Sequence, residues 1–246
     1  LAKMESNSIT EVLLSRKNLG DKFARPVIQV LQKNTSVVHL DLSWNNLTSE
    51  TTKSLIISLA KNSTLKTLNL NSNAIDSDGA KALSEALLQN KGLTSLKLSW
   101  NQLLDDGARM LAACLTPPTP SSSNSSSSHA SSSENRATTA GIPLPPSNTT
   151  LTSLELACNT IRDDGAKALF QAVRLNASLV DLNLEWNEIS EDAIRHGIPV
   201  TIQSNHARSL HLFRNGHIGS ETTKTIAAAM QANSSLKFLT LSGKVG

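Results

Sequence analysis

The sequence contains few large aromatic residues and no tyrosine. Its 246 residues include three tryptophans and four phenylalanines, so aliphatic side chains must supply most of the buried surface. The two cysteines, Cys114 and Cys158, are too few for a disulfide framework, and neither lies in a CxxC motif or near a histidine at metal-ligand spacing. We therefore expect no bound metal, no cofactor and a reducing, cytoplasmic environment.

Charge and hydropathy exclude two further classes of protein. The net charge is +3 and 17% of the residues are charged, which fits neither a polybasic nucleic-acid binder nor an acidic tail. No run approaches the roughly 18 apolar residues of a membrane span. From the charge and the absence of such a run we expect no nucleic-acid or membrane partner. The sequence begins at Leu1 without an initiator methionine, from which we expect a piece of a larger protein.

An internal repeat of 28 residues organises the chain. It is clearest where Leu65-x-x-Leu68-x-Leu70-x-x-Asn73-x-Ile75 is followed by the same pattern from Leu93 to Leu103. A period held this regularly indicates a stack of similar units. Eight copies occur, the last one truncated, and they begin at Ile9, Val37, Leu65, Leu93, Leu151, Leu179, Ala207 and Leu236.

Each copy predicts a short strand followed by a helix. The alternation of Leu68 and Leu70 indicates a strand with one buried face. Ala80, Leu83 and Leu87 then lie three or four residues apart, as on the buried side of a helix.

Polar residues mark both ends of the predicted helices. The Asp or Ser residues just before Gly79, Gly107 and Gly165 are expected to cap the helix that each of them begins. Asparagines such as Asn62 and Asn90 are expected to end the helices in a left-handed conformation.

The repeated pattern resembles the leucine-rich repeat of the ribonuclease-inhibitor type. This resemblance implies a curved right-handed α/β solenoid, or horseshoe, with a parallel sheet on the concave side and helices on the convex side. It also implies an asparagine ladder that satisfies backbone groups of neighbouring loops. Lys17 replaces the asparagine in the first copy, so we expect that loop to differ. The ladder residues are Asn45, Asn73, Asn101, Asn159, Asn187 and Asn215.

Two irregularities interrupt the repeats. We expect residues 1–115 to form the first four copies, 116–147 to be a disordered insertion rich in Ser and Pro, and 148–246 to form the last four copies. The insertion should leave the stack intact, because lengthening a flexible loop costs little. Gly197 and Pro199 fall within the helix of the sixth copy, which predicts a kinked or shortened helix there.

The sequence carries no recognisable catalytic constellation. There is no GxSxG motif, and no His or Asp stands at a spacing that marks the base of a nucleophile. We therefore expect a non-catalytic protein-protein interaction scaffold, present as a monomer, with a protein partner of unknown identity. The alternative is a GTPase-activating module similar to that for Ran, although the loop residues which that activity needs cannot be matched here.

The predicted concave side concentrates the scarce aromatic residues. It holds five of the chain's seven, and exposed aromatics anchor protein interfaces. Each Trp stands directly before a ladder asparagine, so a role in covering the loop backbone is an open alternative. The predicted protein-binding residues are Trp44, Trp100, Trp186, Phe213, Phe238, Asp41, Asp181, Glu185, His211 and Arg214.

The charges assigned to this side are nearly balanced. Six basic residues stand against five acidic ones, which weakens both a nucleic-acid site and the basic target of a ribonuclease inhibitor. The basic residues are Arg16, Lys66, Lys97, Arg208, Arg214 and Lys237, and the acidic ones are Glu11, Asp41, Glu155, Asp181 and Glu185.

Overall fold

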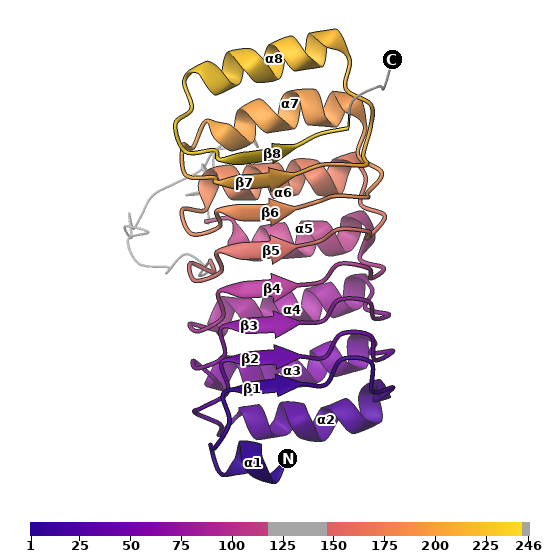
Figure 1. Cartoon of the computed structure of the whole chain (residues 1–246), viewed down its shortest axis with the longest axis vertical. Coiled ribbons are helices and arrows are strands. Elements are labelled where there is room, and N and C mark those ends of the chain that lie inside the picture. The colour runs from indigo at the N-terminus through magenta and orange to yellow at the C-terminus, as the bar shows by residue number, and fades with distance from the viewer. Residues whose placement is uncertain (118–146, 243–246) are drawn as a thin grey trace, which may run out of the picture.

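The computed structural model describes residues 1–117 and 147–242, in which helices and strands alternate along the chain (Figure 1). Most of the predicted insertion, residues 118–146, lies outside the described residues. The helices are α1 (Ala2–Glu5), α2 (Gly20–Leu31), α3 (Ser49–Lys61), α4 (Ser77–Gln89), α5 (Leu104–Leu115), α6 (Asp163–Leu175), α7 (Glu191–Ile202) and α8 (Ser220–Gln231). The strands are β1 (Glu11–Leu13), β2 (His39–Asp41), β3 (Thr67–Asn69), β4 (Ser95–Lys97), β5 (Ser153–Glu155), β6 (Asp181–Asn183), β7 (Ser209–His211) and β8 (Phe238–Thr240).

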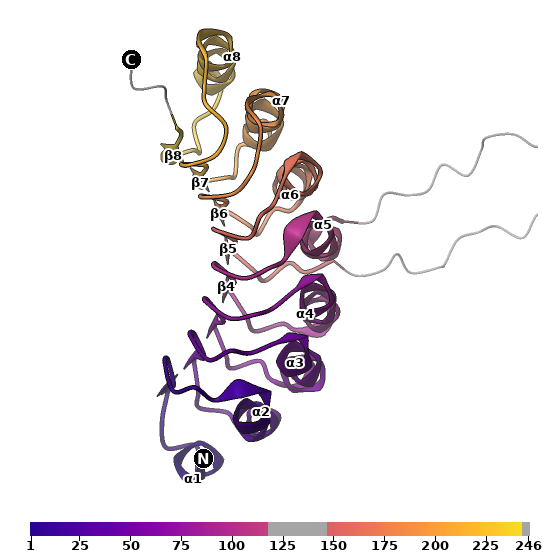
Figure 2. The ribbon, with the colours of Figure 1, turned by 90° about the vertical axis from the view of Figure 1, so that its right-hand side faces the viewer.

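The strands form one parallel sheet in chain order, β1 to β8. Leu40 pairs with Leu68, and across the insertion Leu96 pairs with Leu154, so the added residues do not shift the register. Figure 2 shows the sheet on the inner side of a curved molecule and the helices on the outer side. The predicted curved α/β solenoid is confirmed.

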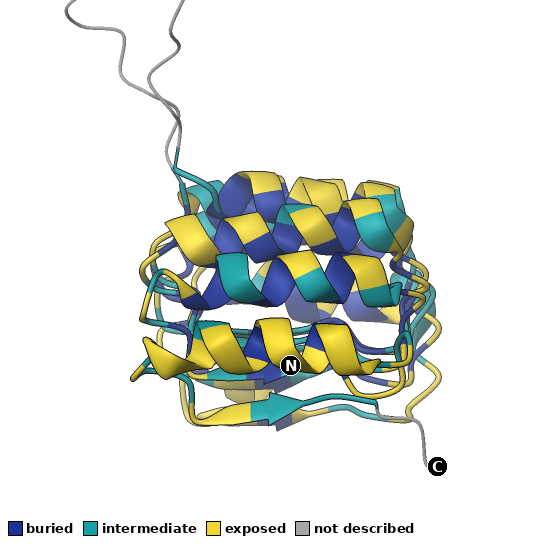
Figure 3. Cartoon of the chain, turned by 90° about the horizontal axis from the view of Figure 1, so that it is seen from above, coloured by how far each residue is buried: buried dark blue, intermediate teal, exposed yellow. Residues whose placement is uncertain are grey.

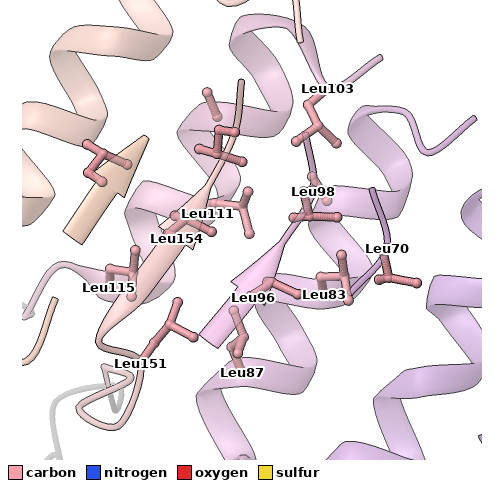
Figure 4. Packing of buried hydrophobic residues seen from close by; sticks show 14 of the residues in the cluster. Leu70, Leu83, Leu87, Leu96, Leu98, Leu103, Leu111, Leu115, Leu151 and Leu154 are labelled. Atoms are coloured by element: carbon pink, nitrogen blue, oxygen red, sulfur yellow. The ribbon is translucent and has the colours of Figure 1, made fainter. Parts of the chain in front are cut away.

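Layers of leucine fill the space between the sheet and the helices (Figure 4). The middle residue of β2, β3 and β4 is a leucine that is at most 1% exposed. Leu83 and Leu87 of α4 meet these residues from the helix side, while the outer faces of the helices remain exposed (Figure 3). Full burial of one leucine contributes about 1.5–3 kcal/mol, so this core needs only one fully buried aromatic residue, Phe170.

The asparagine ladder forms as expected. Oδ1 of Asn45 accepts hydrogen bonds from the backbone N–H groups of Lys17 and Leu19 at 3.0 and 3.2 Å. Its Nδ2 donates to the carbonyl oxygen of Leu14 at 2.8 Å. The loop at Lys17 is held by Asn45 of the next copy. It differs from the second and third copies after this point, because Gly20 has φ 55° whereas Thr48 and Asp76, at the same repeat position, are extended.

The asparagines at the helix ends form a second ladder, which corrects the predicted left-handed ends. Asn62 has φ −93° and ψ 123°, and Asn90 is also extended. Nδ2 of Asn90 donates to the carbonyl oxygens of Leu59 and Asn62 at 2.7 and 2.8 Å. These residues end the helices by bridging to the preceding repeat.

The helix caps also differ from the expectation. Asp76 caps its own helix by accepting from Gly79 N–H at 3.0 Å. Asp105 of α5, in contrast, accepts from the N–H groups of Arg162 and Gly165 at the start of α6. Asp163 of α6 accepts from the N–H and hydroxyl of Ser190, which precedes α7. Several first-turn carboxylates therefore stabilise the next helix rather than their own.

Of the predicted kink or shortening of α7, the shortening is wrong. It has 12 residues, as α2, α5 and α8 do, and includes both Gly197 and Pro199. Gly197 lies against the ring of Phe170, where a Cβ atom would come within 2.1 Å of Cδ2. The glycine therefore makes room for an aromatic ring.

Candidate functional site

The sheet exposes one face on the concave side. The middle residue of β1 to β7 is buried, while the first and third residues are exposed or half-buried. Among the exposed strand positions four residues are acidic, and Lys97 is the one lysine or arginine. Lys97 is itself paired with Glu155 at 2.8 Å. The four acidic strand residues are Glu11, Asp41, Glu155 and Asp181.

The other basic residues assigned to this side lie before or after the strands. Nζ of Lys66 donates to the carbonyl oxygens of Ser63 and Gly92, and Nζ of Lys237 donates to that of Ser234. These ammonium groups are bound to loop backbone at the edge of the sheet. The expected balance of charge does not hold for the strands, which carry an excess of carboxylates.

A row of residues follows the strands, in the repeat position directly before the ladder asparagine, which is Lys17 in the first copy. We call it the indole row. The concave face comprises the exposed strand residues, the indole row and the loop residues that connect them. All seven residues of the row have φ between 54° and 61°. They are Arg16, Trp44, Ser72, Trp100, Cys158, Trp186 and Arg214.

Backbone geometry does not explain the tryptophans in this row. A left-handed φ favours glycine, and a bulky residue there is an outlier. The row nevertheless contains three tryptophans and no glycine, and Trp44, Trp100 and Trp186 are 54%, 61% and 50% exposed. Arg16, Ser72, Cys158 and Arg214 have the same φ, so the left-handed backbone is a property of the repeat. It is compatible with a binding role for the tryptophans as well as with their covering the loop backbone.

Arginines stack on two of the three indoles. The guanidinium carbon of Arg16 lies 4.7 Å from the ring centroid of Trp44, and that of Arg214 lies 4.7 Å from Trp186. Trp100 is flanked in the row by Ser72 and Cys158, and within residues 1–117 and 147–242 no cation lies over its ring. Of the three indoles, Trp100 is therefore the most exposed and the one without a stacked cation in the described residues.

Five predicted residues of the last three repeats lie close together, and they are Trp186, Phe213, Arg214, Glu185 and His211. Arg214 also lies over Phe213, at 5.4 Å. Glu185 accepts a hydrogen bond from Thr240 Oγ1 at 2.9 Å and lies 3.8 Å from Nδ1 of His211. Together with Trp186, these side chains link the sixth, seventh and eighth copies.

The remaining predicted residues lie elsewhere on the concave face. Asp41 ends β2 and accepts hydrogen bonds from the N–H and hydroxyl of Ser43, while Asp181 and Phe238 begin β6 and β8. Arg16 was not among the predicted binding residues. Its repeat position, which it shares with Arg214, could have identified it.

Two shallow hollows lie between the strands. One, of about 270 Å³, is lined by Glu11, His39, Asp41 and Lys97 among others. The other, of about 240 Å³, lies among residues of β5, β6 and β7 that include Asp181 and His211. In the part of the chain that the structure describes, no group of three or more His, Cys, Asp or Glu residues could hold a metal ion.

These features define a repeat solenoid with an open concave sheet. The leucine-rich repeat model matches residues 33–50, 61–84, 89–112 and 147–170, which identifies leucine-rich repeats in these parts of the chain. None of the described helices combines the length and apolar character needed to cross a membrane.

Two solved structures are similar to this chain. Leiomodin-1 actin-binding site 2 is 16% identical, with a TM-score of 0.46 over 82% of this chain and 86% of that one. The tropomodulin C-terminal domain of Caenorhabditis elegans is 10% identical, with a TM-score of 0.43 over 94% and 88%. Neither similarity supports an argument about function. No curated protein matches the chain.

Proposed function

We propose that the chain is a non-catalytic scaffold that binds a protein partner across its concave face. The observation that carries this proposal is the indole row, in which three half-exposed tryptophans occupy left-handed positions that favour glycine. Tryptophan and arginine are the residue types most enriched among the residues that dominate binding energy at protein interfaces. Both types occur in the row.

The composition of the concave face also suits a protein partner. Aromatic anchors in the row lie beside carboxylates on the strands, so a partner would meet apolar and polar groups within one surface. The cluster of Trp186, Phe213 and Arg214 adds a second aromatic patch. An extended sheet face of this kind provides a long surface for recognition in solenoid proteins.

The state of the two cysteines supports a role without thiol chemistry. Burial raises the pKa of Cys114 to about 12. Burial and the nearby charge of Glu185 also raise the pKa of Cys158. Because the thiolate is the reactive form, neither residue is activated as a nucleophile. Both are free thiols, which fits the expected reducing, cytoplasmic location.

The proposal is tested by comparing two sets of substitutions in affinity capture. In the first, Trp44→Ser, Trp100→Ser and Trp186→Ser are combined, since Ser72 shows that the row accepts serine. In the second, the exposed helix residues Phe23, Ile57 and Met110 are all changed to serine. Proteins that bind the wild type and the helix variant but not the row variant support the proposal.

Two results would contradict the proposal. One is equal capture by the row variant and the wild type when both have the same circular dichroism spectrum. The other is faster GTP hydrolysis by a small GTPase in the presence of the chain, which would establish a catalytic role.

A further inference from the structure

We infer that the partner presents a cationic segment to the concave face, and that one of its arginine or lysine side chains stacks on Trp100. This inference rests on the proposed function and specifies the chemistry of the partner. Two features of the concave face support it: the excess of carboxylates on the strands, and the one indole of the row, Trp100, that has no stacked arginine.

The strands present carboxylates that lack a cationic partner. In the described residues Glu11, Asp41 and Asp181 form no ion pair, while Glu155 is paired with Lys97. Glu185, which follows β6, accepts a hydrogen bond from Thr240, and among the described residues its one basic partner is His211, at 3.8 Å. These side chains lie on β1, β2 and β6 and just after β6. A segment lying across the strands would therefore meet negative charge on both sides of β4, the strand that Trp100 follows.

The basic residues around the face do not neutralise this charge at the strands. Lys66 and Lys237 donate to loop carbonyl oxygens. Arg16 and Arg214 lie over indoles. Arg208 precedes β7 at the other end of the strands from the row. The excess of negative charge on the sheet therefore favours a positively charged occupant.

The indole row shows how such an occupant would be held. Two of its three tryptophans already carry a guanidinium 4.7 Å from the ring centroid, supplied by the adjacent repeat. At the third, the adjacent repeats supply only Ser72 and Cys158, and Trp100 is 61% exposed. A guanidinium or ammonium group from a partner would complete the same arrangement. A cation–π contact that the partner shields from water strengthens binding by about thirtyfold.

Spacing alone would also admit a proline-rich segment. Alternate strands lie about 9.6 Å apart, which is close to the rise of about 9.3 Å per turn of a polyproline II helix. A polyproline segment would leave the carboxylates unpaired, so the charge on the strands favours the cationic occupant. The binding experiment distinguishes a cationic segment from a proline-rich one directly.

The test measures binding of labelled octa-arginine, octa-proline and octa-glutamate peptides to the full chain by fluorescence anisotropy. We expect octa-arginine alone to bind, with an affinity that falls as salt rises. Trp100→Ser should weaken binding at least tenfold and Trp100→Phe should retain part of it. The helix-face variant Met110→Ser should bind as the wild type does.

A second variant fills the open position from within the chain. Ser72→Arg places an arginine beside Trp100 in the position that Arg16 occupies beside Trp44, and the backbone of the row accepts arginine at two other loops. We expect this variant to fold normally and to bind octa-arginine at least tenfold more weakly. Asp41→Asn combined with Asp181→Asn should reduce both the affinity and its dependence on salt.

Either of two results would overturn the inference. One is octa-proline binding more tightly than octa-arginine. The other is octa-arginine affinity that stays within twofold in both Trp100→Ser and Ser72→Arg. If octa-arginine does not bind while captured proteins still require the tryptophans of the row, the inference is wrong and the proposed function stands.

Discussion

Gly197 of α7 lies against the ring of Phe170 of α6, so a small residue in one repeat makes room for a large residue in its neighbour. A Cβ atom on Gly197 would lie 2.1 Å from Cδ2 of Phe170. When neighbouring repeats are aligned, Gly197 stands at the position of Leu169, and Phe170 stands at the position of Ala112. The large residue has moved from one helix to its neighbour, so the glycine is a compensation and not simple decay of the repeat.

This exchange predicts strong coupling between the two positions. Gly197→Leu should destabilise the fold by overpacking, and Phe170→Ala should cost about 3–5 kcal/mol by leaving a cavity. The double variant restores the arrangement of the other repeats and should be more stable than either single variant. Urea unfolding of all four proteins gives the coupling energy, and additive losses would exclude the exchange.

The second asparagine ladder predicts a large effect at Asn90. Its side chain is fully buried and makes four hydrogen bonds, with Leu59, Asn62, Gly92 and Leu93. Asn90→Ala leaves these backbone groups unsatisfied and should cost roughly 3 kcal/mol in the free energy of unfolding.

The adjacent Gln89 is exposed and provides a matched control for this experiment. Gln89→Ala should change stability by less than about 0.5 kcal/mol. Equal effects at the two positions, measured by denaturant unfolding, would contradict the role assigned to the ladder.

The cap made by Asp21 predicts a loss of stability in acid. Burial alone would raise the pKa of Asp21, but hydrogen bonds from Thr48 and Thr51 outweigh it and hold the pKa below the usual value. A carboxylate with a lowered folded-state pKa contributes stability above its unfolded pKa of about 4. That contribution is lost as the pH falls through the lower, folded value.

The measurement for Asp21 is the melting temperature between pH 7 and pH 3. Asp21→Asn should lower it at pH 7 and flatten its decline in acid. Asp78→Asn is the control, because Asp78 is an exposed first-turn residue of α4 with no hydrogen-bond partner among the described residues. A decline of the same steepness in Asp21→Asn and the wild type would contradict the prediction.

The two cysteines should differ in reactivity. Cys114 is 3% exposed and its pKa is raised to about 12, whereas Cys158 is half-buried in the indole row. Iodoacetamide at pH 8 should modify Cys158 in the native protein and reach Cys114 only on unfolding. Peptide mass spectrometry before and after addition of urea measures both sites, and equal native modification would refute the prediction.

The left-handed backbone at Trp100 predicts a small effect on stability. Trp100→Gly removes a strain of about 1–2 kcal/mol but also removes the partly buried area of the indole. These effects oppose each other, so the free energy of unfolding should change by less than about 1.5 kcal/mol. A loss above 3 kcal/mol in thermal unfolding would instead assign Trp100 a structural role.

The sequence predicted the features that depend on local pattern. Leu68 and Leu70 marked the strand, and the recurrence of Asn45 marked the ladder, because each of these depends on spacing along the chain. The caps from Asp105 and Asp163 were missed, since hydrogen bonding to the next helix depends on how repeats stack.

The candidate site was predictable only in part. The tryptophans could be placed on one face, because a repeat position fixes where a side chain emerges. The stacking of Arg16 on Trp44 and the turning of Lys66 toward loop carbonyls depend on side-chain conformation. The count of charges in the sequence therefore predicted nearly equal numbers of basic and acidic residues, whereas the exposed strand positions carry an excess of acidic ones.

The two asparagine ladders and the carboxylate caps make neighbouring repeats depend on each other in both directions. Asn45 satisfies the loop of the copy before it, while Asp21 caps the helix of the copy after it. Across the insertion, Leu103 N–H donates to Oδ1 of Asn159, and Asp105 caps α6. In a stack of nearest-neighbour units such reciprocal bonds raise the interfacial coupling. The array should consequently unfold in one cooperative transition that includes the copies on both sides of residues 118–146.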